Sequence, residues 1–233
     1  MALDVDEASR ACRLAECLAP WVGMFKVGMQ LFYGQGPAVV EALRRTGAGV
    51  FLDLKLHDIP RTVAGASRVL ARLGVSMFNV HAAGGAEMMR AAAEAAREEA
   101  AAMGLPPPLV LAVTVLTSIA QAAFARELGF RGRILEKVGA WARLAKECGL
   151  DGVVASAREA AAIRQACGPD FLIVTPGIRP AGAPAGDQKR VATPAEALKA
   201  GATHLVVGRP VTEAADQVEA VKGLLAEIKD SWG

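Results

Sequence analysis

The chain has 233 residues, of which 53% are hydrophobic and 21% are charged, and its formal net charge is +2. This length and hydrophobic content suit one sizeable domain, and the near-neutral charge gives no sign of a general nucleic-acid or anionic-membrane surface. No apolar run approaches the roughly 18–20 residues that span a bilayer, and no signal peptide precedes the first expected element, so we expect a cytoplasmic protein.

Short apolar segments alternate with helix-like segments along the whole chain, which is typical of a parallel α/β fold. The expected strands lie at Ala2–Asp4, Val22–Val27, Gly49–Lys55, Met77–His81, Leu109–Val115, Gly152–Ala155, Leu172–Thr175 and Leu205–Val207. The expected helices lie at Ala8–Leu18, Pro37–Arg45, Thr62–Leu73, Ala86–Ala102, Gln121–Glu147, Ala157–Ala166, Pro194–Ala200 and Ala214–Ile228. Eight such units in this length match a single (β/α)8 barrel over residues 1–233 better than an open doubly wound sheet.

Polar side chains gather at the carboxyl ends of the expected strands, where barrel enzymes place their active sites. These residues are Asp4, Lys26, Asp53, Lys55, His81, Thr117, Ser156, Arg179 and Arg209. The longest irregular stretch, residues 176–191, is rich in Gly and Pro. Its length and composition predict a lid over the site rather than a linker between domains.

The stretch from Asp53 to Asp58 carries the strongest chemical signal. On an extended chain Asp53 and Lys55 project to the same face, and both are costly to desolvate unless they pair or are used. Asp58 adds a second carboxylate just beyond the strand. With acids on both sides, Lys55 is expected to stay protonated and could donate a proton to a developing carbanion.

A metal site is the competing interpretation of this stretch, because Asp53, His57 and Asp58 are all possible ligands. Lys26 and Lys55 argue against it, since they would place positive charge where a divalent cation must sit. We therefore expect no metal here. We interpret His57 and His81 as structural, and His204, at the start of the last expected strand, as remote from the site.

A phosphate site is indicated after the eighth expected strand, where barrels often bind phosphate. Gly208 and Arg209 follow that strand directly. Glycine lets a backbone amide approach an anion, and arginine adds paired donors.

Several stretches match one known family along nearly the whole chain. They are Ala2-Leu3-Asp4, Phe25-Lys26-Val27-Gly28, the D-x-K-x-x-D-I-P-x-T block from Asp53 to Thr62, Val115-Leu116-Thr117-Ser118, Thr175-Pro176-Gly177-Ile178-Arg179-Pro180, Asp187-Gln188 and Val207-Gly208-Arg209-Pro210. The D-x-K-x-x-D-I-P-x-T block is the most specific of them. The chain closely resembles the orotidine 5′-monophosphate decarboxylase family. That family usually has several apolar residues before its Ala-Leu-Asp element, so the first strand is expected to be short here.

The resemblance implies a function and residue roles. The reaction would convert orotidine 5′-monophosphate (OMP) to UMP and CO2 in de novo pyrimidine biosynthesis, with neither metal nor organic cofactor. Lys55 would protonate carbon 6, Asp53 would lie beside the substrate carboxylate, and Lys26 and Asp58 would complete the charged network. Substrate binding would fall to Asp4 and Lys26 at the ribose, Thr117 and Ser118 at the pyrimidine, and Arg179, Gln188, Gly208 and Arg209 at the phosphate.

The resemblance also implies a homodimer in which Asp58 and Thr62 reach the neighbouring subunit's site. Two alternatives stay open at this stage. A sugar-phosphate decarboxylase or aldolase shares D-x-K-x-x-D but uses Mg²⁺ and an enediolate, and the continuation Asp-Ile-Pro-Arg-Thr disfavours it. A catalytically silent nucleotide-binding barrel would have no need for so many close charges.

Overall fold

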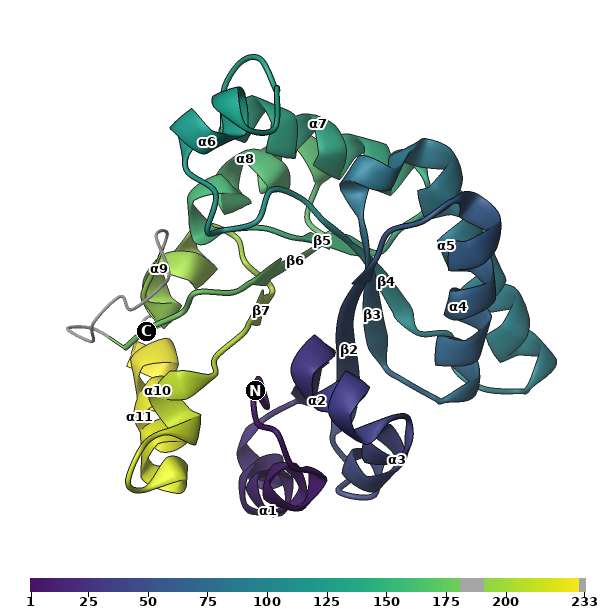
Figure 1. The fold of residues 1–233 in the computed structure, drawn as a ribbon. Helices are drawn as coiled ribbons and strands as arrows, with labels where there is room; N and C mark the ends of the chain where they lie inside the picture. Colours follow the sequence, from purple (N-terminus) through teal and green to yellow (C-terminus); the bar gives the residue numbers. More distant parts are fainter. Residues whose placement is uncertain (181–190, 231–233) are drawn as a thin grey trace.

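The computed structural model describes residues 1–180 and 191–230, and within them seven parallel strands form one curled sheet, a half-barrel (Figure 1). The strands neighbour one another in chain order, and each neighbouring pair is parallel. Their bounds are Met24–Gly28 (β1), Gly49–Leu56 (β2), Met77–His81 (β3), Leu109–Val113 (β4), Gly152–Val154 (β5), Leu172–Thr175 (β6) and His204–Leu205 (β7).

Helices surround the outer face of this sheet (Figure 1). They are α1 (Ala8–Leu18), α2 (Met29–Gln35), α3 (Ala38–Arg44), α4 (Pro60–Arg72), α5 (Gly85–Ala102), α6 (Gln121–Arg126), α7 (Ile134–Glu147), α8 (Ala157–Cys167), α9 (Pro194–Lys199), α10 (Arg209–Thr212) and α11 (Gln217–Asp230), with 3-10 turns η1 (Ala19–Trp21) and η2 (Ala82–Gly84). In the part of the chain that the structure describes, every helix is too short or too polar to cross a bilayer.

The two faces of the sheet bury different sets of apolar side chains. On the inner face Phe51, Met77, Leu111 and Val174 pack together. Alternate residues such as Leu52 belong to the larger cluster that the helices cover. Because side chains alternate along a strand, Asp53 follows Phe51 on the inner face.

The first expected strand is the main departure from the predicted fold. Around Ala2 the structure has one isolated parallel bridge, to Lys26, rather than a strand. The N–H of Ala2 donates to the carbonyl of Val207 (2.7 Å) and that of Leu3 to the carbonyl of Lys26 (3.0 Å). This segment is too short to form a ladder, yet it links β1 to the chain that follows β7.

Other boundaries differ for local reasons. The expected helix Gln121–Glu147 is interrupted between α6 and α7, where Gly129 and Gly132 adopt positive φ values of 69° and 84° that end a helix. Helix α4 begins at Pro60 instead of Thr62, since proline suits the first helical position. The last strand is β7, two residues long, rather than Leu205–Val207, and the short helices α2 and α10 were not predicted.

We expect Gly152→Ala to destabilise the fold, because an added Cβ would collide with the carbonyl oxygen and side chain of Leu172 on the neighbouring strand. Overpacking of this kind costs about 1–3 kcal/mol in the free energy of unfolding. The matched control is Gly223→Ala in α11, where an added Cβ meets nothing within 4 Å; it should raise the stability by up to about 1 kcal/mol. Urea unfolding measures both, and equal midpoints would contradict the packing argument.

Candidate functional site

A cavity of about 390 Å³ lies at the carboxyl ends of the strands and collects most of the predicted site residues. Among its lining residues are Asp4, Lys26, Asp53, Lys55, Thr117, Ser118, Arg179, Gly208 and Arg209. A second cavity, of about 440 Å³, lies among α11, β7 and the inner face of the sheet, and its walls are mainly apolar. The first cavity is the candidate site, because it gathers carboxylates, ammonium groups and guanidinium groups in one place.

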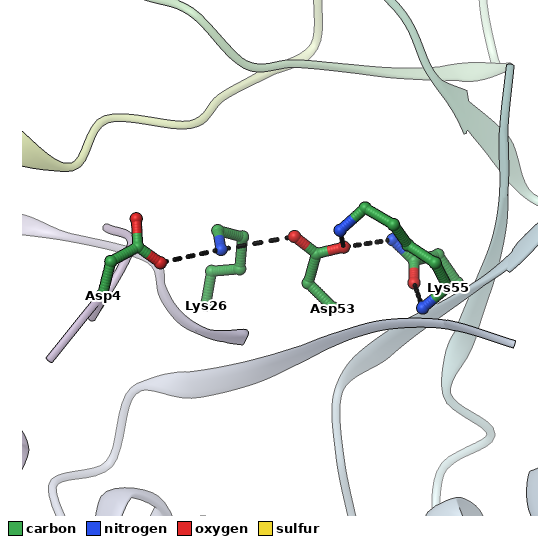
Figure 2. A network of polar contacts seen from close by, with 5 residues as sticks. Asp4, Lys26, Asp53 and Lys55 are labelled. Atoms are coloured by element: carbon green, nitrogen blue, oxygen red, sulfur yellow. Dashed lines mark hydrogen bonds and ion pairs between the residues drawn. The ribbon is translucent and has the colours of Figure 1, made fainter. Parts of the chain in front are cut away.

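Four charged side chains of alternating sign form a row in this cavity (Figure 2). Lys26 Nζ lies 3.3 Å from Asp4 Oδ1 and 3.2 Å from Asp53 Oδ2. Lys55 Nζ lies 2.6 Å from Asp53 Oδ1. Asp53 is therefore held between two ammonium groups, one from the preceding strand and one from its own.

Asp53 and Lys26 are the most buried side chains of the row. Each is 13% exposed, whereas the side chain of Asp4 is 54% exposed. Burial acts to raise the pKa of Asp53, but Lys26, Lys55 and the hydrogen bonds from Lys55 and Asn79 together hold that pKa below its ordinary value. The carboxylate is thus kept ionised by its partners in spite of its burial.

The backbone at Lys55 departs from a regular strand. Lys55 has φ 55°, and it is the only non-glycine residue with positive φ in the described ranges. The β2–β3 register shifts between Leu52 and Leu56, as at a β-bulge. The expected contact between Lys55 and Asp53 is present, but strand alternation alone does not account for it, because the bulge re-aims the Lys55 side chain.

Asn79, in the middle of β3, belongs to this network and was missed by the sequence reasoning. Its Nδ2 donates to Asp53 Oδ1 (2.7 Å), and its Oδ1 accepts from the backbone N–H of Lys55 (2.8 Å). The available signal was a single amide inside the apolar run Met-Phe-Asn-Val. A buried polar side chain needs a partner, so this position could have been linked to the neighbouring strand.

Some predicted site residues lie elsewhere. Asp58 and Thr62 are exposed, and neither lines the cavity formed by the described chain. Asp58 Oδ1 accepts from the N–H of Ile59 (2.6 Å) at the start of α4. Gln188 and most of the predicted lid 176–191 fall outside the described residues.

The remaining polar strand-end residues make structural contacts. The rings of His57 and His81 stack with their centroids 5.3 Å apart, and the rings of His81 and Trp141 form a T-shaped pair with centroids 6.5 Å apart. Burial lowers the pKa of His81, and His57 and Lys55 add to the effect. Ser156 accepts from the N–H of Arg158 and caps α8. In the described ranges, groups of three or more His, Cys, Asp or Glu placed to hold a metal ion are absent.

Comparison with known proteins shows the family of the chain. The model of the orotidine 5′-phosphate decarboxylase / HUMPS family matches residues 1–224. The chain belongs to this family. The orotidine 5′-phosphate decarboxylase of Moorella thermoacetica is 57% identical over 98% of this chain and 91% of that protein, and that of Syntrophomonas wolfei is 54% identical over 99% and 97%.

Two solved structures have the same fold. The crystal structure of orotidine 5′-phosphate decarboxylase from Lactobacillus acidophilus matches with a TM-score of 0.83 and 38% identity, over 97% of this chain and 96% of that chain. An uncharacterised conserved protein from Geobacillus kaustophilus matches with a TM-score of 0.82 and 41% identity, over 100% and 98%. The predicted family is confirmed, and the name that the curated relatives share is that of a carboxy-lyase.

We expect the Asp53 carboxylate to stabilise the fold in a pH-dependent way. Its folded-state pKa is depressed, so the stabilisation is present above the unfolded-state pKa of about 3.9 and is lost as the pH falls through the folded-state value. Asp53→Asn leaves Lys26 and Lys55 without their shared partner. It should lower the free energy of unfolding by about 1–3 kcal/mol at pH 7 and by less at pH 3.

Urea unfolding at several pH values measures this difference. Asp170→Asn, at an exposed carboxyl, is the control and should show no such trend. A deficit of Asp53→Asn that is the same at pH 3 and pH 7 would contradict the role given to the ionised carboxylate.

Proposed function

We propose that this protein decarboxylates OMP to UMP and CO2 in de novo pyrimidine biosynthesis. The network would be Lys26, Asp53, Lys55 and Asp58, working without metal or organic cofactor. The observation that carries the proposal is the Asp53 carboxylate, which is fixed between Lys26 and Lys55 in a cavity that also presents Arg179 and Arg209. Membership of the family and the shared name of the relatives support the same reaction.

In the proposed reaction the bond between carbon 6 and the substrate carboxylate breaks, and its electron pair stays on carbon 6. The Lys55 ammonium then gives a proton to that carbon, which yields UMP, and CO2 leaves. A bare vinylic carbanion needs strong, preorganised stabilisation, and an ammonium held 2.6 Å from Asp53 is suited to provide it. Asp53 would lie beside the departing carboxylate and favour its loss.

The rest of the cavity is proposed to bind the remote parts of the substrate. Asp4 and Lys26 would contact the ribose hydroxyls, and Thr117 and Ser118 the pyrimidine. The phosphate would lie with Arg179, Gln188, Gly208 and Arg209, under a lid formed by residues 176–191. Binding energy gained at the phosphate could then be used at carbon 6, which reacts.

We propose that the active unit is a cytoplasmic homodimer of single (β/α)8 domains, with Met1–Asp4 in the place of the first strand. Asp58 and Thr62 would enter the neighbouring subunit's site. Their exposure, away from the cavity of their own chain, supports this arrangement. Ala2 bonds to Val207, which follows β7, and Leu3 bonds to Lys26 on β1, so this segment bridges the two edges of the half-barrel. These bonds support the proposal of a closed barrel.

The competing reaction is that of a sugar-phosphate aldolase or decarboxylase that uses Mg²⁺ and an enediolate. The block from Asp53 to Thr62 favours the pyrimidine nucleotide instead. Exhaustive chelation separates the two, since the activity proposed here should survive it. A catalytic amount of protein should also cause the absorbance of OMP to fall. A protein that binds OMP without this loss of absorbance would be a binding module, not an enzyme.

We expect Lys55→Ala to lower kcat for OMP by at least about 10³-fold, because it removes both the proton donor and the charge beside the carbanion. Loss of OMP absorbance in a stopped assay measures the rate, and circular dichroism checks that the variant is folded. Lys229→Ala, at an exposed lysine of α11, is the control and should turn over normally. Near-normal turnover by Lys55→Ala would refute the proposed donor.

A subunit-mixing experiment tests the shared site. Lys55→Ala and Asp58→Ala should each be nearly inactive alone. After mixing and subunit exchange, a hybrid dimer would have one site with both residues intact, so about a quarter of the wild-type activity should return. No recovery after verified exchange would contradict the placement of Asp58 in the partner's site.

A further inference from the structure

Asn79 is an amide placed where the fold alone would favour an apolar side chain. It lies in the middle of β3, with 1% of its surface exposed, between Phe78 and Val80, which are fully buried. Phe51 and Met77 pack together on the inner face, and by strand alternation Asp53 and Asn79, two residues further along each strand, face the same side. A polar group so deeply buried is retained in a structure when it is hydrogen-bonded.

The two hydrogen bonds of Asn79 determine the orientation of its amide. Only Nδ2 can donate to Asp53 Oδ1, at 2.7 Å, and only Oδ1 can accept from the N–H of Lys55, at 2.8 Å. Exchanging the two atoms would place an acceptor against a carboxylate and a donor against an N–H. The side chain therefore holds two parts of the charged row at once.

The backbone of Lys55 and the carboxylate of Asp53 both need to be held in place. Lys55 has φ 55°, a conformation that a residue with a side chain rarely adopts, and Asn79 accepts the N–H of that same residue. Asp53 Oδ1 receives both the Lys55 ammonium and the Asn79 amide, which fixes the plane of the carboxylate. The amide thus ties the strained backbone of Lys55 to the group that its ammonium contacts.

We propose that Asn79 is a positioning residue that aims the Lys55 ammonium and orients the Asp53 carboxylate for the proposed decarboxylation, on which this inference rests. A carboxamide presents a donor and an acceptor on one rigid plane. Aspartate at this position would lack the donor, and leucine, of similar shape, would lack both. Glutamine is one methylene longer and would displace the contacts within a packed core.

The charged groups around Asp53 define what each variant changes. Lys26 faces it from β1 and Lys55 from β2, while Asp4 reaches it only through Lys26. Arg179 and Arg209 line the same cavity. Asn79→Asp keeps an acceptor for Lys55 but removes a donor to Asp53 and adds a negative charge beside it, which favours protonation of Asp53.

Steady-state kinetics on the full-length protein test the role. Asn79→Leu should lower kcat by about 100-fold, since misplacement near a reacting atom by about 1 Å costs that much, and should leave KM within about threefold. Asn79→Asp should move the acidic limb of the pH profile of kcat to higher pH, because the added negative charge favours protonation of Asp53. The control is Ser67→Ala, which also removes a buried hydrogen bond, from Ser67 Oγ to the carbonyl of Val63 (2.8 Å), at a residue that does not line the cavity.

A merely structural role predicts a different result. Asn79→Leu would then melt earlier, as is expected of Ser67→Ala, while its folded fraction turned over at the wild-type rate. That outcome would overturn the proposal. If Asn79→Leu does not fold, Asn79→Ala takes its place, because it removes both hydrogen bonds and adds neither bulk nor charge.

Crystal structures of the wild type and Asn79→Leu separate this inference from the proposed function. We expect Lys55 in the variant to leave the positive-φ region or its ammonium to move off Asp53 Oδ1. An unchanged φ and an unchanged 2.6 Å contact would overturn the positioning role, whatever the activity. A wild-type protein that does not consume OMP would instead overturn the proposed function and leave this structural test intact.

Discussion

The carboxylate of Asp53 is the group on which the candidate site depends. Three neighbouring strands of the sheet supply its partners: Lys26 on β1, Lys55 on β2 and Asn79 on β3. An ionised carboxylate that is 13% exposed is tolerable only with such partners, because burial alone would favour its protonation. The hydrogen-bonded pairing of the parallel strands therefore sets the geometry of the charges, and the side chains of Phe51 and its neighbours form an apolar layer on the same inner face.

Exposure to solvent differs along the row of charges, and this bears on the proposed chemistry. The row runs from an exposed acid, Asp4, through Lys26 to the shielded pair of Asp53 and Lys55. Its inner members are thus held in place before any substrate binds, so little reorganisation is needed when charge develops at carbon 6. The bulge at Lys55 and the amide of Asn79 contribute to the same rigidity, because each restricts where the ammonium can point.

Much of this could be predicted from the sequence, for identifiable reasons. Strand-end polarity placed residues such as Lys26 and Arg209 at one cavity, because parallel strands end at the same edge. The left-handed backbone of Lys55 could not be predicted, since it depends on a register shift against β3. For Asn79 the burial and the need for a partner on a neighbouring strand could be inferred, but the identity of the two partners, Asp53 and the N–H of Lys55, could not. The short segment at Ala2 shows that strand composition does not fix strand length.

The hydrogen bond between Ala2 and Val207 has a consequence for folding during synthesis. The backbone of Ala2 bonds to Val207, and Gly208 and Arg209 come directly afterwards, so segments about 200 residues apart in the sequence meet at the cavity. Contacts of such large sequence separation form slowly, because a long loop must close first. During synthesis the cavity can be completed only after the chain has left the ribosome as far as Arg209. A nascent chain that ends before Val207 would carry Asp53 and Lys55 on their strand but lack the closing wall.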